Sequence, residues 1–473
     1  MAAQLRSPNK PQAFSKDAGA AYYAAPAAIF ERKVNSMLES VKNVFKVKDI
    51  RQKLLFTFLM MVVIRFGSQL PVPGVDREYF ASWFAEQVGD SFGFLNAFTG
   101  GSFLNMSVMA LNITPYITSS IIIQLLTIAI PKLEEMQREG EEGRKKMTAI
   151  TRYLTVGLAV MEGLAMSIGF GRSGLLEEYN FINVLMVVAT LTAGSAILMW
   201  LGEQITVYGV GNGISIVLTI NIISRMPQDI VSLFQQFVIG QKVAYGAIAA
   251  VVILAVILGV TVLVIYLNDA ERRIPVQYAQ KMQGRRLVGS AGSFLPLKVN
   301  TAGVMPIIFA SSLMQFPGIV SQLAGYKGTG VWSEVLRYLS SSYWLNPNYF
   351  RYTIGLVVYL VLMVFFAYFY TSITFNPIEI ADNMKKRGGF IPGIRPGRPT
   401  SDYLYRILNY IIFIGVCGLI IVAVIPFFFQ GFFNASVTFA GTSLIIVVSV
   451  ILETIKQIES LMMVRNYKGF LND

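Results

Sequence analysis

The sequence predicts an all-α protein that crosses a membrane many times. Of its 473 residues, 54% are hydrophobic and only 14% are charged, a balance far from that of soluble domains. The apolar residues gather in runs of about 20, the length that a helix needs to cross the hydrocarbon core. The chain has no histidine and one cysteine, Cys417, which excludes an intrachain disulfide, a His/Cys metal cluster and a Ser-His-Asp triad. We therefore expect a polytopic membrane protein that is not an enzyme and needs no cofactor or metal.

The N-terminal part of the chain is predicted to stay outside the membrane. Residues 1–36 are rich in Ala, Pro, Ser and Lys without a sustained period, which predicts a disordered extension. This stretch lacks the apolar core and cleavage site of a signal peptide, so we expect no processing. Residues 37–52 then place an apolar stripe that includes Val41 and Phe45 opposite basic residues such as Lys42. This pattern predicts an interfacial amphipathic helix.

Ten apolar runs follow that could cross the membrane, of which the fifth is short. They are 54–73, 110–130, 153–170, 181–201, 213–226, 246–267, 301–324, 352–372, 405–426 and 439–456. The tails and loops on one side of these runs carry 30 Lys and Arg residues, and those on the other side carry seven. By the positive-inside rule, both termini are cytoplasmic.

An even number of spans with both ends inside fits two halves of five spans each. The halves are 53–226 and 227–456, followed by a cytoplasmic tail at 457–473. Because five is an odd number, two related halves must have opposite orientations in the membrane. No clear residue-level repeat supports the inversion, which rests on the count alone.

The second run and the stretch before it are unusually polar for a membrane segment. Seven polar residues interrupt the run 110–130: Asn112, Thr114, Thr118, Ser119, Ser120, Gln124 and Thr127. Because unsatisfied polar groups in hydrocarbon cost several kcal/mol each, one side of this span must face protein or a wet cavity. Residues 94–109 are apolar but broken by Gly100 and Gly101, like the broken helices of channels and transporters. A plain turn is the alternative interpretation of the two glycines.

Two cytoplasmic loops combine basic charge with features of fixed structure. Loop 268–298 is long enough for a hairpin that projects from the membrane, and loop 373–404 contains eight Pro and Gly residues that favour a rigid, turned backbone. Together they suggest a docking site for a large anionic partner. The alternative is that both loops only satisfy the positive-inside rule.

From Met37 onward the chain resembles the SecY family of protein-conducting channel subunits. The matching motifs include FGSQLPVPGVD (66–76), NAFTGGS (96–102), ITPYITSSIIIQLL (113–126), GVGNGISI (209–216) and ADNMKKRGGFIPGIRPG (381–397). The resemblance implies a clamshell of ten helices in two inverted halves, which acts as a passive channel in the bacterial plasma membrane. It implies SecE, SecG, the SecA ATPase, the ribosome, signal-bearing preproteins and membrane lipids as partners.

The resemblance also implies a pore ring and a plug. The pore ring would comprise Ile113, Ile117, Ile214, Leu218, Ile308 and Ile446. Such a collar of aliphatic side chains resists wetting, yet deforms around a peptide because it offers no fixed hydrogen-bond partner. Ordinary helix packing is the alternative for Ile113 and Ile117. The plug, at about 94–109, would be a short helix that closes the external funnel, and includes Phe98, Gly100, Gly101 and Phe103.

Two further sites are carried over from the family. Thr118, Glu162 and Asn300 match a polar cluster on the lateral gate, the seam between spans 2 and 3 and spans 7 and 8, where the family pattern has a glutamine in place of Glu162. The docking surface for SecA and the ribosome would centre on Arg395. Its other candidates are Arg272, Arg273, Lys281, Arg285 and Arg286. Arg65, inside the first span, has no assigned role; it either snorkels to the interface or pairs within the bundle.

Two other classes of protein remain as alternatives at this stage. An ion-coupled secondary transporter also fits ten spans, inverted halves and a broken helix, but should carry ionisable residues at the membrane midplane, where Glu162 is the main candidate. A membrane-embedded enzyme would need an Asp pair, a His/Glu metal set or a Ser-His pair, and the sequence gives no sign of these.

Overall fold

The computed structural model describes residues 47–77, 79–80, 82, 99–172, 174–176, 178–237, 243–278, 281–283, 286–288, 293–323, 330–433 and 443–469. By its internal contacts, the described chain divides into a large unit, Thr57–Thr454, and a second unit made of the two described ends, up to Phe56 and from Ile455. The predicted extension at 1–36 and most of the predicted interfacial helix at 37–52 lie outside the described residues.

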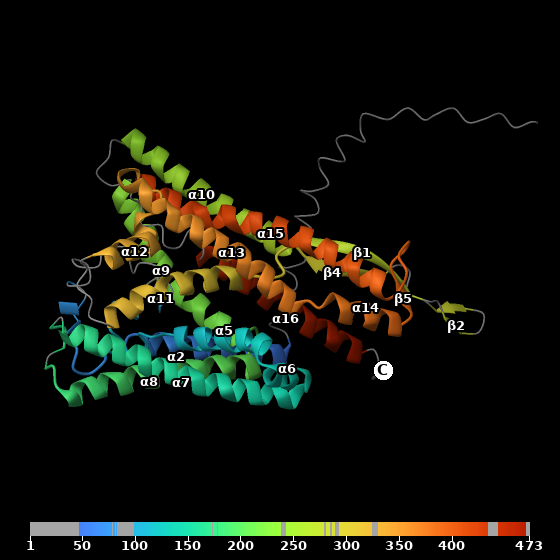
Figure 1. The fold of residues 1–473 in the computed structure, drawn as a ribbon, viewed down its shortest axis with the longest axis horizontal. Helices are drawn as coiled ribbons and strands as arrows, with labels where there is room; N and C mark the ends of the chain where they lie inside the picture. The colour runs from blue at the N-terminus through green and yellow to red at the C-terminus, as the bar shows by residue number, and fades with distance from the viewer. Residues whose placement is uncertain are drawn as a thin grey trace, which may run out of the picture. The chain divides into compact units, whose positions relative to one another are not determined.

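The described part of the chain is mainly helical (Figure 1). In the first half the helices are α2 (Lys48–Gly67), α5 (Thr114–Ala129), α6 (Pro131–Arg138), α7 (Glu141–Arg172), α8 (Phe181–Tyr208) and α9 (Gly213–Phe237). The second half has α10 (Val243–Asp269), α11 (Met305–Leu323), α12 (Val331–Leu339), α13 (Thr353–Thr374), α14 (Pro377–Lys386), α15 (Arg398–Phe433) and α16 (Leu444–Gly469), with the short 3-10 helices η2 (Ser341–Tyr343) and η3 (Pro347–Tyr352). The strands are β1 (Glu271–Tyr278), β2 (Lys281–Gln283), β3 (Arg286–Val288), β4 (Ser293–Lys298) and β5 (Gly389–Phe390).

A helix covers most of each of the ten predicted runs. By length and hydropathy, six of the described helices can each cross a membrane, or seven if the bent pair α5 and α6 forms one span. The chain is therefore a multi-pass membrane protein, and the total of ten spans stays a prediction. The bend between α5 and α6 measures 108° and falls at Pro131.

Several helix ends differ from the prediction. Helix α2 ends at Gly67 rather than continuing to 73, because Pro71 and Pro73 cannot donate helical hydrogen bonds and disfavour helix in the residues before them. Helix α9 passes through Pro227 and continues to Phe237, where the prediction ended at 226. Neighbouring helices can satisfy the backbone groups that a proline frees, so prolines are tolerated in membrane helices.

The start of α5 and the end of α16 also differ from the prediction. Helix α5 begins at Thr114, four residues later than predicted, because residues 100–113 form a run of turns up to the Pro115 start signal. Helix α16 continues to Gly469 through what was predicted to be a tail. Its amphiphilic second half, which includes Lys456, has too little hydropathy to be read as a span but does not oppose helix formation.

Within the large unit, the membrane helices form two packing groups (Figure 1). In the first group α7 lies against α5 and α8, and α8 lies against α9. In the second, α13 lies against α11 and α15, and α10 lies against α15. The groups meet where α11 contacts α7 and where α9 contacts α10.

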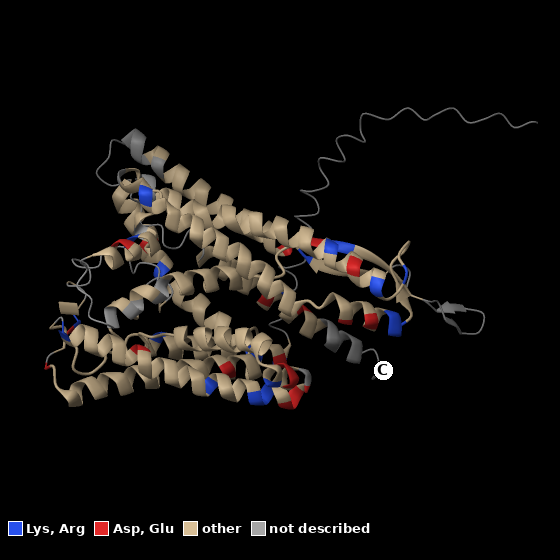
Figure 2. Cartoon of the chain, viewed as in Figure 1, with Lys and Arg blue, Asp and Glu red and all other residues tan. Residues whose placement is uncertain are grey.

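The hairpin predicted for loop 268–298 is present. Strand β1 pairs antiparallel with β4, from Glu271 opposite Lys298 to Val276 opposite Ser293. Loop 373–404 forms α14 and then β5, which adds to the other edge of β1 through Gln277 and Phe390. The two loops thus share one sheet, and a separate apolar cluster that includes Ile274, Ile391 and Leu404 lies beneath it. In Figure 2 charged residues gather at the end of the large unit that carries α6, α14 and β1.

We predict that Gly213→Ala destabilises the contact between α8 and α9. A Cβ at Gly213 would overlap the carbonyl oxygen of Gly202, which is backbone and cannot move aside as a flexible side chain could. Overpacking of this kind costs about 1–3 kcal/mol. The thermal unfolding temperature of the purified complex should fall.

Gly259→Ala is the matched control, because the added Cβ at this helical glycine of α10 meets no atom within 4 Å. Its unfolding temperature should stay at or slightly above that of the parent, since alanine favours helix over glycine. Equal unfolding temperatures for the two variants would contradict the close approach.

Candidate functional site

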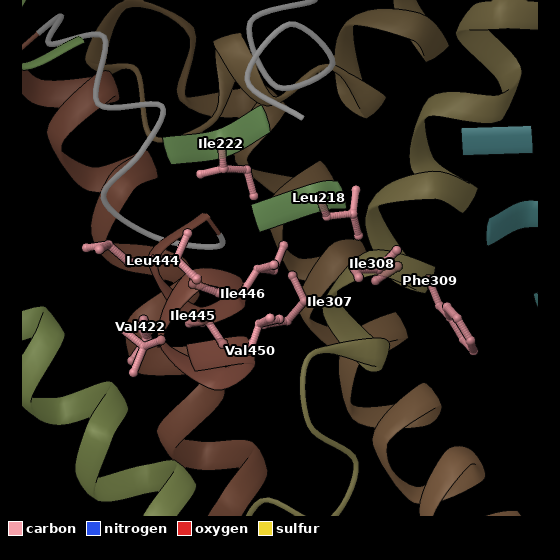
Figure 3. Packing of buried hydrophobic residues seen from close by; sticks show 14 of the residues in the cluster. Leu218, Ile222, Ile307, Ile308, Phe309, Val422, Leu444, Ile445, Ile446 and Val450 are labelled. Atoms are coloured by element: carbon pink, nitrogen blue, oxygen red, sulfur yellow. The ribbon is translucent and has the colours of Figure 1, made fainter. Parts of the chain in front are cut away.

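The largest cluster of buried apolar residues contains or touches all six residues predicted for the pore ring. Ile113 and Ile446 are fully buried, and Leu218 and Ile308 are each 5% exposed. Ile117 and Ile214 are half-buried and pack against the same cluster. Figure 3 shows Leu218 from α9, Ile308 from α11 and Ile446 from α16 within it. Four separate segments of the chain therefore supply these side chains to one apolar region.

Local sequence features position these side chains. Ile113 is the residue before α5, and its carbonyl accepts hydrogen bonds from the amides of Tyr116 and Ile117 at 3.1 and 3.0 Å. At the start of α9, the side-chain oxygen of Asn212 accepts from the amide of Ile214 at 3.1 Å. An aliphatic residue at or next to the start of each helix thus packs into or against the cluster. Branched aliphatic groups offer a passing chain no hydrogen-bond partner.

The segment before α5 enters the protein without regular structure. Of the predicted plug, the structure describes residues 99–109, and Phe98 lies outside the described part. Thr99 is helical, and residues 100–113 form a succession of turns with a β-bridge between Ser107 and Pro71. Residues 70–72 pair with residues 106–108 through Val72 N to Met106 O at 2.9 Å and Val108 N to Leu70 O at 2.8 Å. This pairing joins the chain that follows α2 to the end of the predicted plug.

Phe103 anchors the same segment in a second apolar cluster. Its ring meets that of Phe80 at 6.2 Å in an edge-to-face arrangement, and Phe80 meets Phe170 of α7 at 4.9 Å. Such aromatic pairs stabilise by about 0.5–1.5 kcal/mol beyond the area that they bury. Phe103 is 6% exposed, so the described half of the predicted plug is packed into the protein.

The two glycines of the segment are required by the backbone geometry. Gly100 and Gly101 have φ values of 63° and 84°, which a residue with a Cβ rarely adopts. A Cβ at Gly100 would lie 2.6 Å from the carbonyl oxygen of Asn221 and 2.9 Å from Nη1 of Arg65. The backbone at Gly100 therefore passes directly against α9. The two glycines form the centre of a turn that the amide of Ser102 closes on the Thr99 carbonyl at 3.2 Å, as the plain-turn alternative describes.

Polar groups from three elements surround the segment. Arg65 of α2 donates from Nη1 to the carbonyl of Gly100 at 3.4 Å. Asn221 of α9 donates from Nδ2 to Oδ1 of Asn112 at 3.0 Å, and the Ser195 hydroxyl of α8 donates to the Asn112 carbonyl at 3.1 Å. Asn112 itself has φ of 53°, a left-handed conformation that asparagine tolerates better than most residues.

The three residues predicted for the lateral gate lie on α5, on α7 and just before α11. Thr118 of α5 and Glu162 of α7 are half-buried, and α7 contacts α11. Asn300 precedes α11 and donates to Oδ1 of Asn268 at 2.7 Å, while Asn268 donates to Ser449 of α16 at 2.8 Å. In the described part of the chain, no hydrogen bond joins Asn300 to Thr118 or Glu162. The strongest polar contacts of Asn300 are therefore within the second half.

The cytoplasmic loops present several of the predicted docking residues. Arg395 is exposed between Gly393 and Gly397, whose φ values are 83° and 100°. The buried hydroxyl of Thr400 donates to the Arg395 carbonyl at 2.9 Å, and the amide of Ile394 bonds the carbonyl of Ile391 at 3.0 Å. These bonds fix the backbone on both sides of the arginine and leave its side chain free to reach outward.

The other docking candidates differ in their surroundings. Arg272 and Arg273 of β1 are exposed, and Arg273 forms an ion pair with Glu271 at 2.6 Å. Lys281 belongs to β2 and Arg286 to β3, which pair antiparallel, and Arg285 lies outside the described residues. Within the described part of the chain, no group of three or more His, Cys, Asp or Glu residues is placed to hold a metal ion.

Sequence reasoning missed several polar residues of the interior. Arg65 was left without a role, and Asn221, Asn268 and Ser449 were not singled out. The available signal was their position: each is a polar residue within or at the end of an apolar helix, where burial requires a partner. Which partner each would take depends on the packing of distant segments.

Comparison with known proteins gives consistent results. A family model described as SecY matches residues 107–455. The protein translocase subunit SecY of Streptomyces galbus is 43% identical over 452 residues, which cover 92% of this chain and all of the relative.

Solved channel structures share the fold. One describes the plug domain of a SecY protein as stabilizing the closed state of the translocation channel; it is 19% identical, with a TM-score of 0.58 over 89% of this chain and 96% of that chain. Another, Sec61 in the canine ribosome-channel complex, is 18% identical with a TM-score of 0.57 over the same shares of the two chains.

We predict that Thr400→Val loosens the loop around Arg395. Valine keeps the shape of threonine but removes the hydroxyl that donates to the Arg395 carbonyl. Loss of a hydrogen bond of this kind costs about 1 kcal/mol, so amide hydrogen exchange at 393–397 should accelerate roughly fivefold.

Thr301→Val provides the control, because Thr301 makes an equivalent bond to the carbonyl of Lys298 at the end of β4. Exchange at 393–397 should be unchanged in this variant. If amide hydrogen exchange at 393–397 in Thr400→Val equals that of the parent, other contacts fix the loop and the prediction is wrong.

Proposed function

Because this chain belongs to the SecY family, we propose that it is the protein-conducting channel of a bacterial Sec translocase. It passes unfolded secretory chains across the plasma membrane and releases apolar helices sideways into the lipid. The observation that carries the proposal is the convergence of the six predicted pore-ring residues on one apolar cluster. The turn segment 100–113 leads into the first of these residues.

The proposed pore ring acts as a deformable seal. Branched aliphatic side chains from α5, α9, α11 and α16, together with Ile113, make a hydrophobic constriction that excludes water and ions. A polypeptide can pass because the side chains change rotamer at little cost and bind no sequence in particular. Sealing and lack of selectivity therefore come from the same chemistry.

The proposed plug is the segment at about 94–109, including Phe98, Gly100, Gly101 and Phe103. Its described residues are packed against α9 and the second apolar cluster, which supports a closed arrangement in this structure. For the plug to leave, these contacts have to be exchanged for those of the translocating chain. A signal helix that enters between α7 and α11 would supply such contacts, and the proposed gate residues Thr118, Glu162 and Asn300 lie on the elements that would separate.

The proposed channel is passive and depends on partners. The sequence contains no G-x-x-x-x-G-K-[ST] nucleotide-binding motif, so the driving energy is supplied by SecA or by a translating ribosome. Arg395 is the main docking residue, and Arg272, Arg273, Lys281, Arg285 and Arg286 of loop 268–298 are the further candidates. Contacts of these residues to ribosomal RNA phosphates would weaken as salt rises.

Further parts of the proposal follow from the family and the charge pattern. SecE and SecG complete the membrane complex, and both termini of this chain are cytoplasmic. The comparisons favour this function over the ion-coupled transporter, because the matching relatives are translocase subunits.

We predict that Arg395→Glu abolishes motor-driven translocation. Liposomes that contain this chain with SecE receive SecA, ATP and a signal-bearing precursor, and protease-protected precursor is scored. Charge reversal at an exposed docking residue slows association with an acidic partner surface, so protection should fall about tenfold or more.

Arg144→Glu is the control, since Arg144 is also exposed but lies in the first turn of α7, outside the two loops of the proposed surface. It should keep most of the parental protection. If the parent protects no precursor while a labelled small solute accumulates under an ion gradient, the transporter alternative replaces the channel.

We also predict that Ile446→Ser makes the resting channel leaky. Ile446 is fully buried in the apolar cluster, and a hydroxyl there favours wetting of the constriction. Ion efflux from liposomes should rise without SecA or precursor.

Ile421→Ser carries the same chemical change to a side chain of α15 that is 55% exposed on the outside of the bundle. Its efflux should equal that of the parent. If Ile421→Ser leaks as much as Ile446→Ser, the leak comes from general loosening and the pore-ring assignment fails.

A further inference from the structure

Arg65 is an unusual residue for its place in the chain. It lies two residues before the end of α2, among apolar residues of a membrane helix, and its side chain is half-buried. A charged group in this position is costly and is retained when it has a partner or a function. Arg65 donates to the carbonyl of Gly100, 35 residues further along the chain, so it does not simply extend toward the membrane surface.

The contact between Arg65 and Gly100 requires that residue 100 be glycine. A Cβ there would lie 2.9 Å from Nη1 of Arg65 and 2.6 Å from the carbonyl oxygen of Asn221. The same missing methyl group therefore lets the guanidinium and the backbone of α9 approach Gly100 together. The positive φ of Gly100 turns the backbone between them.

A second polar contact ties the far end of the segment to the same residue of α9. Asn221, whose backbone touches Gly100, donates from its side chain to Asn112 at 3.0 Å. Asn221 and Asn112 are each 1% exposed, so this bond is formed away from water. The side-chain oxygen of Asn221 is also buried and has no hydrogen-bond partner among the described residues, which leaves the closed arrangement incompletely satisfied.

We propose that Arg65 is a positioning residue for the plug, which clasps the Gly100 carbonyl and, with the Asn221–Asn112 bond, holds segment 100–112 against α9 in the closed channel. The proposal rests on the proposed function. The Arg65 bond to the Gly100 carbonyl is long, at 3.4 Å, and its charged donor allows it to bias the closed state. Its release needs only the movement of one side chain. Arginine suits this position because it stays charged and presents several donors in a fixed plane.

If Arg65 holds the plug in this way, replacing it by a shorter residue should release the plug more often. Cys417, the only cysteine, is first replaced by serine, and Ser102→Cys is then introduced as a reporter, because Ser102 is 2% exposed. A membrane-impermeant maleimide is added to spheroplasts, where it reaches the external face alone. In the Arg65→Ala variant the reporter should be labelled about tenfold faster than in the parent, the effect of losing one hydrogen bond to a charged group.

Three further variants sharpen the test. Arg172→Ala removes an exposed arginine at the end of α7 and should label at the parental rate. Arg65→Lys keeps a charged donor and should recover part of the protection. Gly100→Ala displaces the guanidinium from the other side of the contact and should label as fast as Arg65→Ala.

Translocation of a signal-bearing precursor by the complete complex distinguishes the outcomes. Faster labelling of Arg65→Ala with translocation at least as fast as the parent supports the clasp, because only the closed state is weakened. Parental labelling, or faster labelling accompanied by loss of complex and of translocation, overturns it. If Arg65→Ala is labelled faster than the parent but the parent complex translocates no precursor, the clasp stays in place and the proposed function is overturned.

Discussion

A backbone amide or carbonyl within the hydrocarbon core has no water to bond, so each one in this chain needs a partner in the protein. Helices meet this requirement by themselves, but residues 100–113 form turns instead. Turn bonds within the segment, such as Ser102 N to Thr99 O and Asn105 N to Gly101 O, satisfy some of its groups. Others are satisfied from outside: residues 70–72 pair with 106–108, and Arg65 and Ser195 donate to the carbonyls of Gly100 and Asn112. A segment that takes these outside partners has to lie inside the protein.

Much of the fold could be predicted from the sequence, because a membrane helix is recognised by a long run of apolar residues. The runs that became α7, α8 and α13 were located without knowledge of their neighbours. Two of the errors fell at prolines: α2 ended before Pro71, whereas α9 continued through Pro227, and the surrounding helices decide which outcome a proline has.

The candidate site was less accessible to sequence reasoning. The positions of the pore-ring residues came from family resemblance, since an isoleucine in an apolar run has the same local signature whether it packs or lines a constriction. Hydrogen-bond partners were harder still. Asn300 was assigned to a seam with Thr118 and Glu162, and the structure joins it to Asn268, on a helix that ends about 30 residues earlier in the chain. Such pairings depend on long-range packing that no local pattern records.

The pairing of residues 70–72 with 106–108 restricts how the preceding segment can move. Two backbone hydrogen bonds hold its C-terminal end to the chain that leaves α2, and Gly100 and Gly101 lie several residues before them. Displacement of residues 106–108 along the chain direction breaks both bonds at once, whereas rotation about these residues keeps them. Under the proposed function, the plug therefore opens by rotation about residues 106–108 and keeps its pairing with the chain after α2.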